Sequence, residues 1–275
     1  MLQAWPLMAR EAPIAAVALY ERDSGGHVGV FAQNLRTGAT LAWRAGDRFV
    51  MCSTFKASLA ACVLMQVDRG LDSLASRIRY GAADIGDWHA PVARANLASG
   101  WLPVGEACEA AVEQSDNTCA NLLLSRIGGP PVLTSFWRRI GDDVSRLDDP
   151  EPILNFRAPG DAHDTTTPSA MADTLRRLVL GNVLSEGSRQ ILIRWLLGCR
   201  TGGRRLRAGL PSSWRIGNKT GNNGGDAAGD IAVAWSARNA PIVMAVYTRG
   251  GSPSAAQTDA VFAGIGRHIG SHLAD

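Results

Sequence analysis

The sequence predicts an α/β protein of the α+β type, with an antiparallel sheet flanked by helices and an additional all-helical lobe. Strand-like segments lie near both ends of the chain, and the stretch from about residue 53 to 198 is patterned mostly for helices. The simplest architecture joins the strands of both ends in one sheet and inserts the helical stretch between them. We therefore expect residues 1–50 and 200–275 to form one discontinuous α/β domain and residues 51–199 to form a helical domain.

The N-terminal elements follow from local patterns. Residues 8–23 are expected to form an amphipathic helix. Residues 28–35 and 40–44 are expected to be strands, because both are rich in apolar residues and the turn signal Arg36–Gly38 separates them.

Four of the predicted helices of the middle stretch end on a glycine. They cover residues 53–70, 118–128, 168–181 and 185–198. The glycines Gly70, Gly128, Gly181 and Gly198 stand where a C-cap is expected.

Strand signals return after Gly202. Residues 213–221, 230–237 and 241–249 are expected to be strands, and residues 255–269 a final helix. These segments complete the sheet that the N-terminal strands begin.

Composition and charge limit the classes of partner that the sequence supports. A formal net charge of +3, without any run of lysine or arginine, gives no support for a nucleic-acid or membrane partner. No segment has about 18 consecutive apolar residues, so no membrane-spanning helix is expected. The N-terminal stretch lacks the pattern of a signal peptide, so for an exported protein that peptide is expected to lie outside this sequence.

The five cysteines show neither a CxxC pair nor the spacing of metal ligands. We therefore expect no metal site and interpret the cysteines as buried free thiols. They are Cys52, Cys62, Cys108, Cys119 and Cys199.

Lysine is nearly absent, which makes the two lysines informative. Of 28 basic residues, only Lys56 and Lys219 are lysines. Arginine cannot lose its proton, whereas a desolvated lysine can, and its compact ammonium fits where a planar guanidinium does not. The two lysines therefore mark candidate chemistry.

Both lysines fall within short motifs. Ser53-Thr54-Phe55-Lys56 opens a predicted helix, so Ser53 and Lys56 share one helix face, and Ser53 lies near backbone N–H groups that could bind an oxyanion. Lys219-Thr220-Gly221 ends a predicted strand, and Ser115-Asp116-Asn117 begins another helix. Each motif alone has an ordinary interpretation as a cap, a turn or a solvated charge, but the ordered set of three does not.

With these motifs the chain resembles the class A serine β-lactamases, whose signature is S-x-x-K, S-D-N and K-T-G. The surrounding segments RFVMCSTFK, SDNTCANLLL, EPILN and PGDAHDTTTP extend the resemblance over nearly the whole chain. Residues 146–165 match the family's omega loop. This long non-helical stretch carries its own apolar residues, which favours an ordered functional loop.

The resemblance implies that Ser53 is the nucleophile that forms an acyl-enzyme with penicillins and cephalosporins. Lys56 and Glu151 are rival bases for acylation, a question that stays open. Glu151, with Asn155, would activate the water that hydrolyses the acyl group, and Ser115 would relay a proton to the leaving nitrogen.

The same resemblance implies the substrate-binding residues. Asn117 would bind the side-chain amide, and Lys219 and Thr220 the carboxylate. The backbone N–H groups of Ser53 and Asn222 would form the oxyanion hole, and Gly221 of the third motif belongs to the substrate-binding residues. By spacing to Lys219, Arg205 matches an arginine of some members, with Arg204 and Arg207 as competitors. The aromatic residue at the cleft mouth lies within Trp88-His89-Ala90-Pro91; Trp88 is the expected one, a packed surface tryptophan being the alternative.

The expected function is therefore β-lactam hydrolysis that confers antibiotic resistance, by a periplasmic or secreted monomer that needs no cofactor. The alternatives are a penicillin-binding D,D-peptidase, a class that shares the three motifs but lacks the loop glutamate, and a non-hydrolytic β-lactam sensor. Neither alternative needs deacylation machinery, so Glu151 and Asn155 favour the hydrolase.

Departures from the family pattern concern the omega loop and the cysteines. Many members pair an arginine two residues before the loop glutamate with an aspartate at the loop's end, where this chain has Asp149 and Asp164. Either Arg146 or Arg157 substitutes, or the loop is looser. We expect a more mobile loop that admits bulky oxyimino-cephalosporins, and Asp149→Arg should then tighten it.

The family's disulfides are not expected here. The partner position of Cys108 is Ala60, and Asn222 and Asn223 follow the third motif where a partner of Cys52 would stand. Cys52 is therefore no argument for carbapenem hydrolysis.

Overall fold

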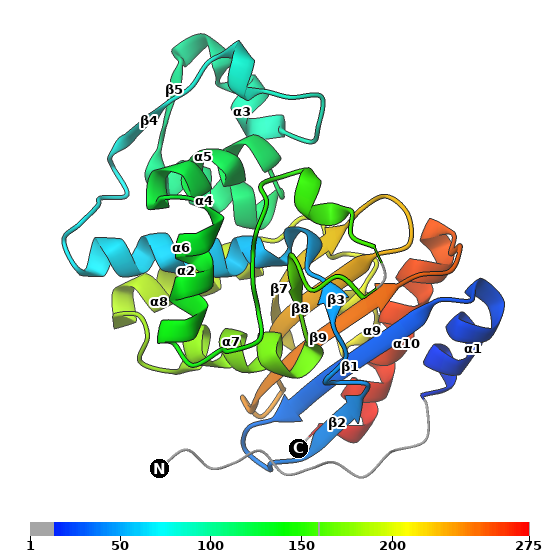
Figure 1. Cartoon of the computed structure of the whole chain (residues 1–275). Helices are drawn as coiled ribbons and strands as arrows, with labels where there is room; N and C mark the ends of the chain where they lie inside the picture. Colours follow the sequence, from blue (N-terminus) through cyan, green and yellow to red (C-terminus); the bar gives the residue numbers. More distant parts are fainter. Residues whose placement is uncertain (1–13, 159, 275) are drawn as a thin grey trace.

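A five-stranded antiparallel sheet is the central element of the computed structural model, which describes residues 14–158 and 160–274 (Figure 1). The strand order is β2-β1-β9-β8-β7, so strands from both ends of the chain lie side by side. The strands are β1 His27–Asn34, β2 Thr40–Trp43, β7 Arg215–Asn222, β8 Ala228–Trp235 and β9 Pro241–Arg249. This confirms the predicted sheet.

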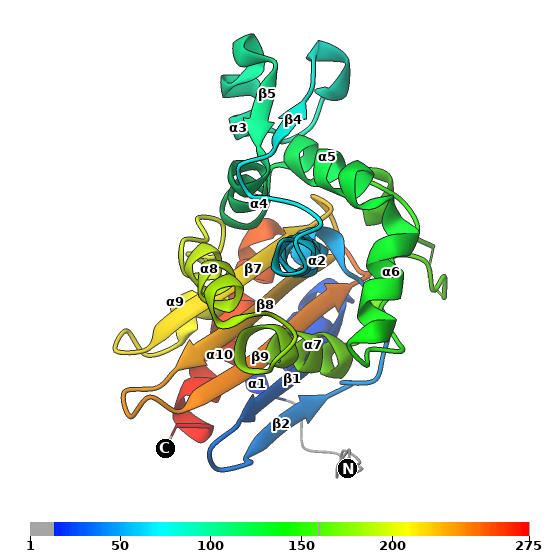
Figure 2. The same cartoon turned by 90° about the vertical axis from the view of Figure 1, so that its left-hand side faces the viewer.

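Each face of the sheet is covered by helices, because alternate residues of a strand point to opposite faces. Val243, Ala245 and Tyr247 of β9 belong to the larger core, whereas Ile242 and Met244 belong to the smaller one. The smaller core lies under α1 Ala15–Ser24, α9 Leu206–Gly209 and α10 Ala255–His272 (Figure 2). The larger core lies under α2 Phe55–Asp68, α7 Pro168–Leu180 and α8 Glu186–Leu197.

Helix α2 is the centre of the larger core. Every residue from Phe55 to Met65 is buried, as expected for a helix that is apolar all round. Three further helices contact α2: α4 Val104–Glu113, α5 Asn117–Ile127 and α6 Pro130–Arg139. Helix α3 Pro91–Ala95 packs against α5, farther from the sheet. The remaining elements are β3 Phe49–Val50, β4 Arg77–Arg79, β5 Trp101–Pro103, β6 Thr165–Thr166, and the 3₁₀ turns Cys52–Thr54, Ala82–Asp84, Leu97–Ser99 and Ile153–Asn155.

Helices α7 and α8 contact the sheet although they belong to the predicted helical domain. The contacts do not define separate domains, so the predicted domain boundaries at residues 50/51 and 199/200 stay a prediction. Among the described residues, no helix is both long and apolar enough to cross a membrane.

Several predicted helix ends shift in the structure. The first helix spans Ala15–Ser24, and its predicted residues 8–13 lie outside the described residues. Gly128 caps α5 in the left-handed conformation (φ 103°), and Gly70 (φ 70°) stands just beyond α2. Gly181 and Gly198 are the C-cap residues of α7 and α8, as predicted, although their φ values of −93° and −74° are not left-handed.

All five cysteines lie in the described part, and each is a free, buried thiol. This confirms the interpretation from sequence. Burial raises the pKa of Cys62 to about 11, so the thiol form dominates at neutral pH.

The central position of α2 predicts an asymmetry between two leucines. Leu59 in α2 is completely buried, whereas Leu71, just after the helix, is 74% exposed. Leu59→Ala should lower the free energy of unfolding by about 2–5 kcal/mol through lost burial and a residual cavity. Leu71→Ala should change it by less than about 0.5 kcal/mol. Urea denaturation measures both, and equal losses would contradict the central role of α2.

Candidate active site

Ser53 lies in the 3₁₀ turn that leads into α2, where strand β7 runs alongside. Only 8% of the residue is exposed. The neighbouring Cys52 has φ 45°, a left-handed value that costs a non-glycine residue of the order of 1–3 kcal/mol and is typical of functional sites. A Cβ on Gly221 would lie 2.7 Å from the backbone N of Ser53, so β7 can approach the turn only because Gly221 has no side chain.

Glu151 connects the omega loop to Ser53 and Lys56. Ser53 Oγ donates a hydrogen bond to Glu151 Oε1 (2.7 Å), and Lys56 Nζ lies 3.1 Å from the same oxygen. Asn155 Nδ2 donates to the other oxygen, Oε2, at 2.5 Å. Ser53 and Lys56, predicted to meet on one helix face, therefore meet at a carboxylate oxygen.

Burial and charge act in opposite directions on this pair. Burial lowers the pKa of Lys56, while the Glu151 charge raises it less. Burial alone would raise the pKa of Glu151, but the Lys56 ammonium and the hydrogen bonds from Ser53, Lys56 and Asn155 lower it below its usual value. Glu151 is therefore a carboxylate at neutral pH, able to accept a proton.

Ser115 lies between the two lysines. Its Oγ accepts hydrogen bonds from Lys219 Nζ (3.0 Å) and Lys56 Nζ (3.4 Å), which leaves its own hydrogen to donate toward the cleft. Burial, helped by the Lys56 charge, lowers the pKa of Lys219 to about 7. Ser115 itself has φ 59°, another left-handed value in the site.

A cleft of about 360 Å³ brings most of the predicted residues together. The predicted residues that line it are Ser53, Asn117, Ser115, Glu151, Asn155, Thr220, Gly221, Asn222 and Arg205. Lys56 and Lys219 are completely buried behind this lining. Asn117 Oδ1 accepts a hydrogen bond from Lys56 Nζ, and Thr220 Oγ1 pairs with Thr201 Oγ1 at 2.5 Å.

Trp88 does not line the cleft, and its neighbour His89 does. The Trp88 ring lies against Gly86, where a Cβ would meet it at 2.1 Å, and its Nε1 donates to Thr118 Oγ1 (2.9 Å). The alternative of a packed tryptophan is thus the correct one. His89 is exposed, with its Nε2 2.8 Å from the Gln114 carbonyl.

Arg205 is hydrogen-bonded to the third motif. It is 9% exposed, and its Nη1 donates to the carbonyls of Gly221 (2.8 Å) and Gly229 (2.9 Å). Arg204 lies on the rim and pairs with Asp259 at 2.9 Å. Arg207 instead donates to Asn218 Oδ1 (2.8 Å), outside the cleft lining.

Asn121 is a site residue that the sequence analysis missed. Its Oδ1 accepts the backbone N–H of Glu151 (3.0 Å), and its Nδ2 donates to the Glu151 carbonyl (2.9 Å). Asn121 follows Asn117 by four residues and so shares its face of α5, which is the signal that could have identified it.

Arg157 supplies the cation that the omega loop lacks at residue 149. Its guanidinium pairs with both Asp149 and Asp164, and its Nε donates to Asp164 Oδ2 at 2.7 Å. Asp164 also accepts the backbone N–H groups of Asp148 (2.7 Å) and Asp149 (3.0 Å). Arg146 pairs with Asp148 instead. Of the two candidates, Arg157 is therefore the substitute for the missing arginine.

No group of three or more His, Cys, Asp or Glu side chains within residues 14–158 and 160–274 is placed to hold a metal ion. The polar groups that line the cleft are hydroxyls, amides, arginines, the His89 ring and the carboxylates of Glu151 and Asp259. This set suits nucleophilic attack on a carbonyl by a serine with a neighbouring base.

The ion pairs of Arg157 reverse the expectation for Asp149→Arg. A second arginine would now repel Arg157, so hydrogen exchange in the loop segment from Asp148 to Ala158 should become faster. Arg157→Gln should accelerate the same exchange at least about tenfold, because charge-assisted hydrogen bonds to a buried carboxylate are lost. Arg146→Gln, which removes the more exposed pair with Asp148, serves as the control. Unchanged exchange in Arg157→Gln would refute the assignment.

Comparisons with known proteins agree with this geometry. The model of the Beta-lactamase enzyme family matches residues 9–273. A carbapenem-hydrolyzing β-lactamase KPC from Klebsiella oxytoca is 44% identical over 91% of this chain and 85% of its own. β-Lactamase L2 from Stenotrophomonas maltophilia is 47% identical over 91% of this chain and 82% of its own.

Solved structures give the same result. The ancestral class A β-lactamase of Gram-negative bacteria superposes with a TM-score of 0.89 at 51% identity, covering 93% of this chain and 98% of that chain. A β-lactamase from Xanthomonas campestris pv. campestris gives 0.90 at 44%, covering 94% and 96%. The chain therefore belongs to the β-lactamase enzyme family, as a class A serine β-lactamase.

Proposed function

We propose that the protein hydrolyses penicillins and cephalosporins through an acyl-enzyme on Ser53 and so confers resistance to them. The observation that carries the proposal is the position of Glu151. One of its carboxylate oxygens bonds Ser53 and the other bonds Asn155. A single base is thereby placed beside the nucleophile and beside an amide that can orient a water.

Acylation begins with attack of Ser53 Oγ on the lactam carbonyl carbon. The proton of Ser53 already lies on the hydrogen bond to Glu151 Oε1, which supports Glu151 as its acceptor. The Lys56 ammonium, 3.1 Å from the same oxygen, holds the carboxylate in its charged form. Lys56 becomes the alternative base if substrate binding displaces that ion pair, since burial lowers its pKa.

The negative charge that develops on the lactam oxygen is stabilised by backbone N–H groups. The N–H groups of Ser53 and Asn222 are the proposed donors, and each is typically worth about 2.7–4 kcal/mol. The close approach of Gly221 to the Ser53 backbone supports this pairing.

Ser115 is the proposed proton donor to the departing lactam nitrogen. Both lysines donate to its oxygen, so its hydrogen is directed away from them. Lys219 and Thr220 are proposed to hold the substrate carboxylate, and Asn117 the side-chain amide. Arg205, bound to the Gly221 carbonyl, adds positive charge beside the carboxylate position.

Deacylation distinguishes a hydrolase from the alternatives. We propose that Glu151, with Asn155, activates the water that attacks the acyl carbonyl. A D,D-peptidase or a β-lactam sensor needs no such carboxylate next to its serine. The short contacts of Glu151 with Ser53 and Asn155 therefore support hydrolysis.

We further propose that the protein acts as a monomer in the periplasm or after secretion, with β-lactams as its partners and no nucleic acid or membrane. Class A β-lactamases are typically exported. The net charge of +3, without any run of lysine or arginine, is too small to indicate a polyanionic partner.

Excess chromogenic cephalosporin should be turned over many times by the native protein. Glu151→Gln should instead give one burst per protein molecule and a covalent adduct on Ser53, detectable by intact mass. The deacylating water then lacks its base, whereas Lys56, without its ion pair, can still accept the Ser53 proton during acylation. Ser53→Ala, the control, should give neither. Continued turnover by Glu151→Gln without an adduct would show that another group activates the water, and a stoichiometric burst in the native protein would indicate a sensor or peptidase.

Gly221→Ala tests the approach of β7 to the nucleophile. The new Cβ would lie 2.7 Å from Ser53 N and 2.8 Å from Cys52 Cβ, so β7 must move away. Displacement of one oxyanion donor should reduce kcat about 100-fold or more. Gly203→Ala is the matched control, since a Cβ there meets nothing within 4 Å. Steady-state kinetics measure kcat of both variants. Equal kcat values for Gly221→Ala and Gly203→Ala would exclude the proposed oxyanion hole.

A further inference from the structure

Asp230 is a buried acid behind the part of the catalytic cleft that contains the third motif. Its side chain is completely buried and does not line the cleft. In the sheet it pairs with Thr220 on β7 and with Val246 on β9, a residue of the smaller core. The side chain of Asp230 therefore points to the face of the sheet under α9 and α10. The proposed mechanism makes no use of it.

The hydrogen-bond donors to this acid are neutral. Its Oδ1 accepts from Asn218 Nδ2 (2.9 Å) and its Oδ2 from the backbone N–H of Leu206 (3.2 Å), and no ion pair among residues 14–158 and 160–274 includes Asp230. Burial raises the pKa of Asp230 to about 6, although the hydrogen bonds and the charges of Arg205 and Lys219 lower it. A carboxylate is therefore present at neutral pH, and its charge is not neutralised by contact with one cation.

Asp230 fastens the chain segment from residue 205 to 207 to the sheet. The N–H of Leu206 bonds the carboxylate directly. Arg207 Nη2 donates to Asn218 Oδ1 (2.8 Å), and the amide nitrogen of the same Asn218 donates to Asp230. The segment is thus held to β7 through Asn218 and to β8 through Asp230.

The two donors to Asp230 are chain neighbours of the two cations proposed for the substrate carboxylate. Leu206 directly follows Arg205, and Asn218 directly precedes Lys219. Arg205 is 9% exposed and Lys219 is completely buried. A change at Asp230 therefore reaches both cations through one hydrogen bond and one peptide unit.

The charge of Asp230 also acts on Lys219. Burial, then the Lys56 ammonium on α2, lowers the pKa of Lys219 to about 7, whereas Cys199, Glu151 of the omega loop and Asp230 on β8 act to raise it. Glu151 already contacts Lys56 at 3.1 Å. Asp230 is therefore the carboxylate around Lys219 that no other cation contacts.

We propose that Asp230 is a positioning residue of the substrate-carboxylate site, which fastens the segment carrying Arg205 to the sheet and keeps Lys219 an ammonium at neutral pH. The inference rests on the proposed function, because it concerns how that site holds the carboxylate that penicillins and cephalosporins share.

Asp230→Asn tests the charge while keeping the shape. Lys219 should then lose its proton at lower pH, so the basic limb of kcat/KM should move down by about one pH unit. The basic limb of kcat should move less, because the carboxylate of the bound substrate itself holds the ammonium. Native and variant should agree below about pH 6, where the native Asp230 is protonated. Coincident basic limbs of kcat/KM would overturn the proposal.

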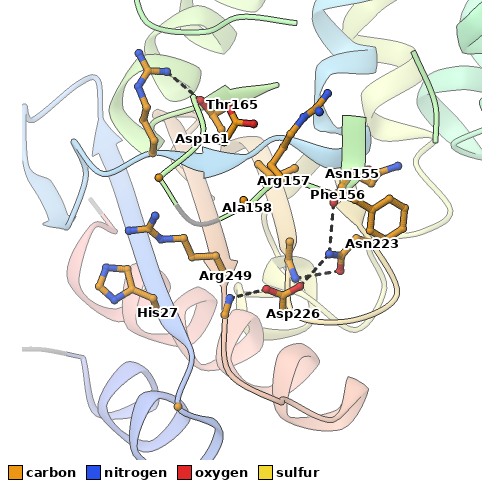
Figure 3. A pocket seen from close by; sticks show the side chains of 16 residues that line it. His27, Asn155, Phe156, Arg157, Ala158, Asp161, Thr165, Asn223, Asp226 and Arg249 are labelled. Carbon is orange, nitrogen blue, oxygen red and sulfur yellow. Dashed lines mark hydrogen bonds between the residues drawn. The ribbon is translucent and has the colours of Figure 1, made fainter. Parts of the chain in front are cut away.

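Asp226→Asn is the matched control. Asp226 also accepts from an asparagine amide, Asn223 Nδ2 (3.0 Å), and from a backbone N–H, that of Gly250 (2.9 Å), but it lines a separate cavity of about 630 Å³ beside the omega loop (Figure 3). Its substitution should leave the basic limb at the native pH. A shift as large as that of Asp230→Asn would show a general effect of net charge and would overturn the proposal.

The double variant Asn218→Asp/Asp230→Asn returns the charge to the pair. The carboxylate then stands on β7, where Arg207 and the new amide can donate to it, and the amide oxygen on β8 can accept the N–H of Leu206. We expect a cooperative thermal unfolding transition and a basic limb that moves back toward the native pH. A folded double variant whose basic limb stays with that of Asp230→Asn would contradict the role of the charge.

A titration without substrate separates this proposal from the proposed function. With a carbon-13 label at lysine Cε, Lys56 and Lys219 give the two lysine signals in the NMR spectrum, and Lys219→Arg identifies the second. In the native protein the Lys219 signal should show an additional inflection near pH 6, where Asp230 titrates. In Asp230→Asn that inflection should vanish and Lys219 should titrate at lower pH. A Lys219 signal insensitive to Asp230 would overturn this inference, whereas the expected titration in a protein that hydrolyses no β-lactam would refute the proposed function alone.

Discussion

The buried ion pair between Lys56 and Glu151 is the interaction on which the rest of the site depends. Both side chains are completely removed from solvent, and removing one partner of such a pair typically costs about 3–5 kcal/mol because the other charge stays buried and unpaired. The hydrogen bonds from Ser53 and Asn155 to the carboxylate, and those from Lys56 to Ser115 and Asn117, offset the desolvation of both charges. One electrostatic contact thus joins the central helix, the omega loop and the second motif.

Much of this arrangement could be predicted from local sequence. The segments at both chain ends are rich in apolar residues in patterns typical of strands. In the structure these strands pair in one sheet, as expected. The scarcity of lysine identified Lys56 and Lys219, which are both completely buried in the structure. Lysine is kept at these two positions because arginine cannot lose its proton and its planar group does not fit there. The scarcity of lysine in the composition was enough to identify both positions.

What could not be predicted depends on which side chains meet in three dimensions. Trp88 and His89 are adjacent, and only the packing of one ring on Gly86 decides which of them faces the cleft. Asn121 holds Glu151 across 30 residues of chain. Gly181 and Gly198 end their helices without the left-handed conformation that is common at a glycine C-cap. Asp149 suggested a looser loop, but Arg157 lies within the loop itself and restores the charge balance from the inside.

The five unpaired thiols have a consequence for how the protein reaches its folded state. Because no covalent cross-link joins the described residues and all five sulfurs are buried, the stability of the native fold does not vary with the reduction potential around it. Burial also raises the pKa of Cys52, Cys108 and Cys119, so the reactive thiolate is suppressed and oxidants find little to attack. Within the described residues the native structure is therefore complete without any thiol oxidation.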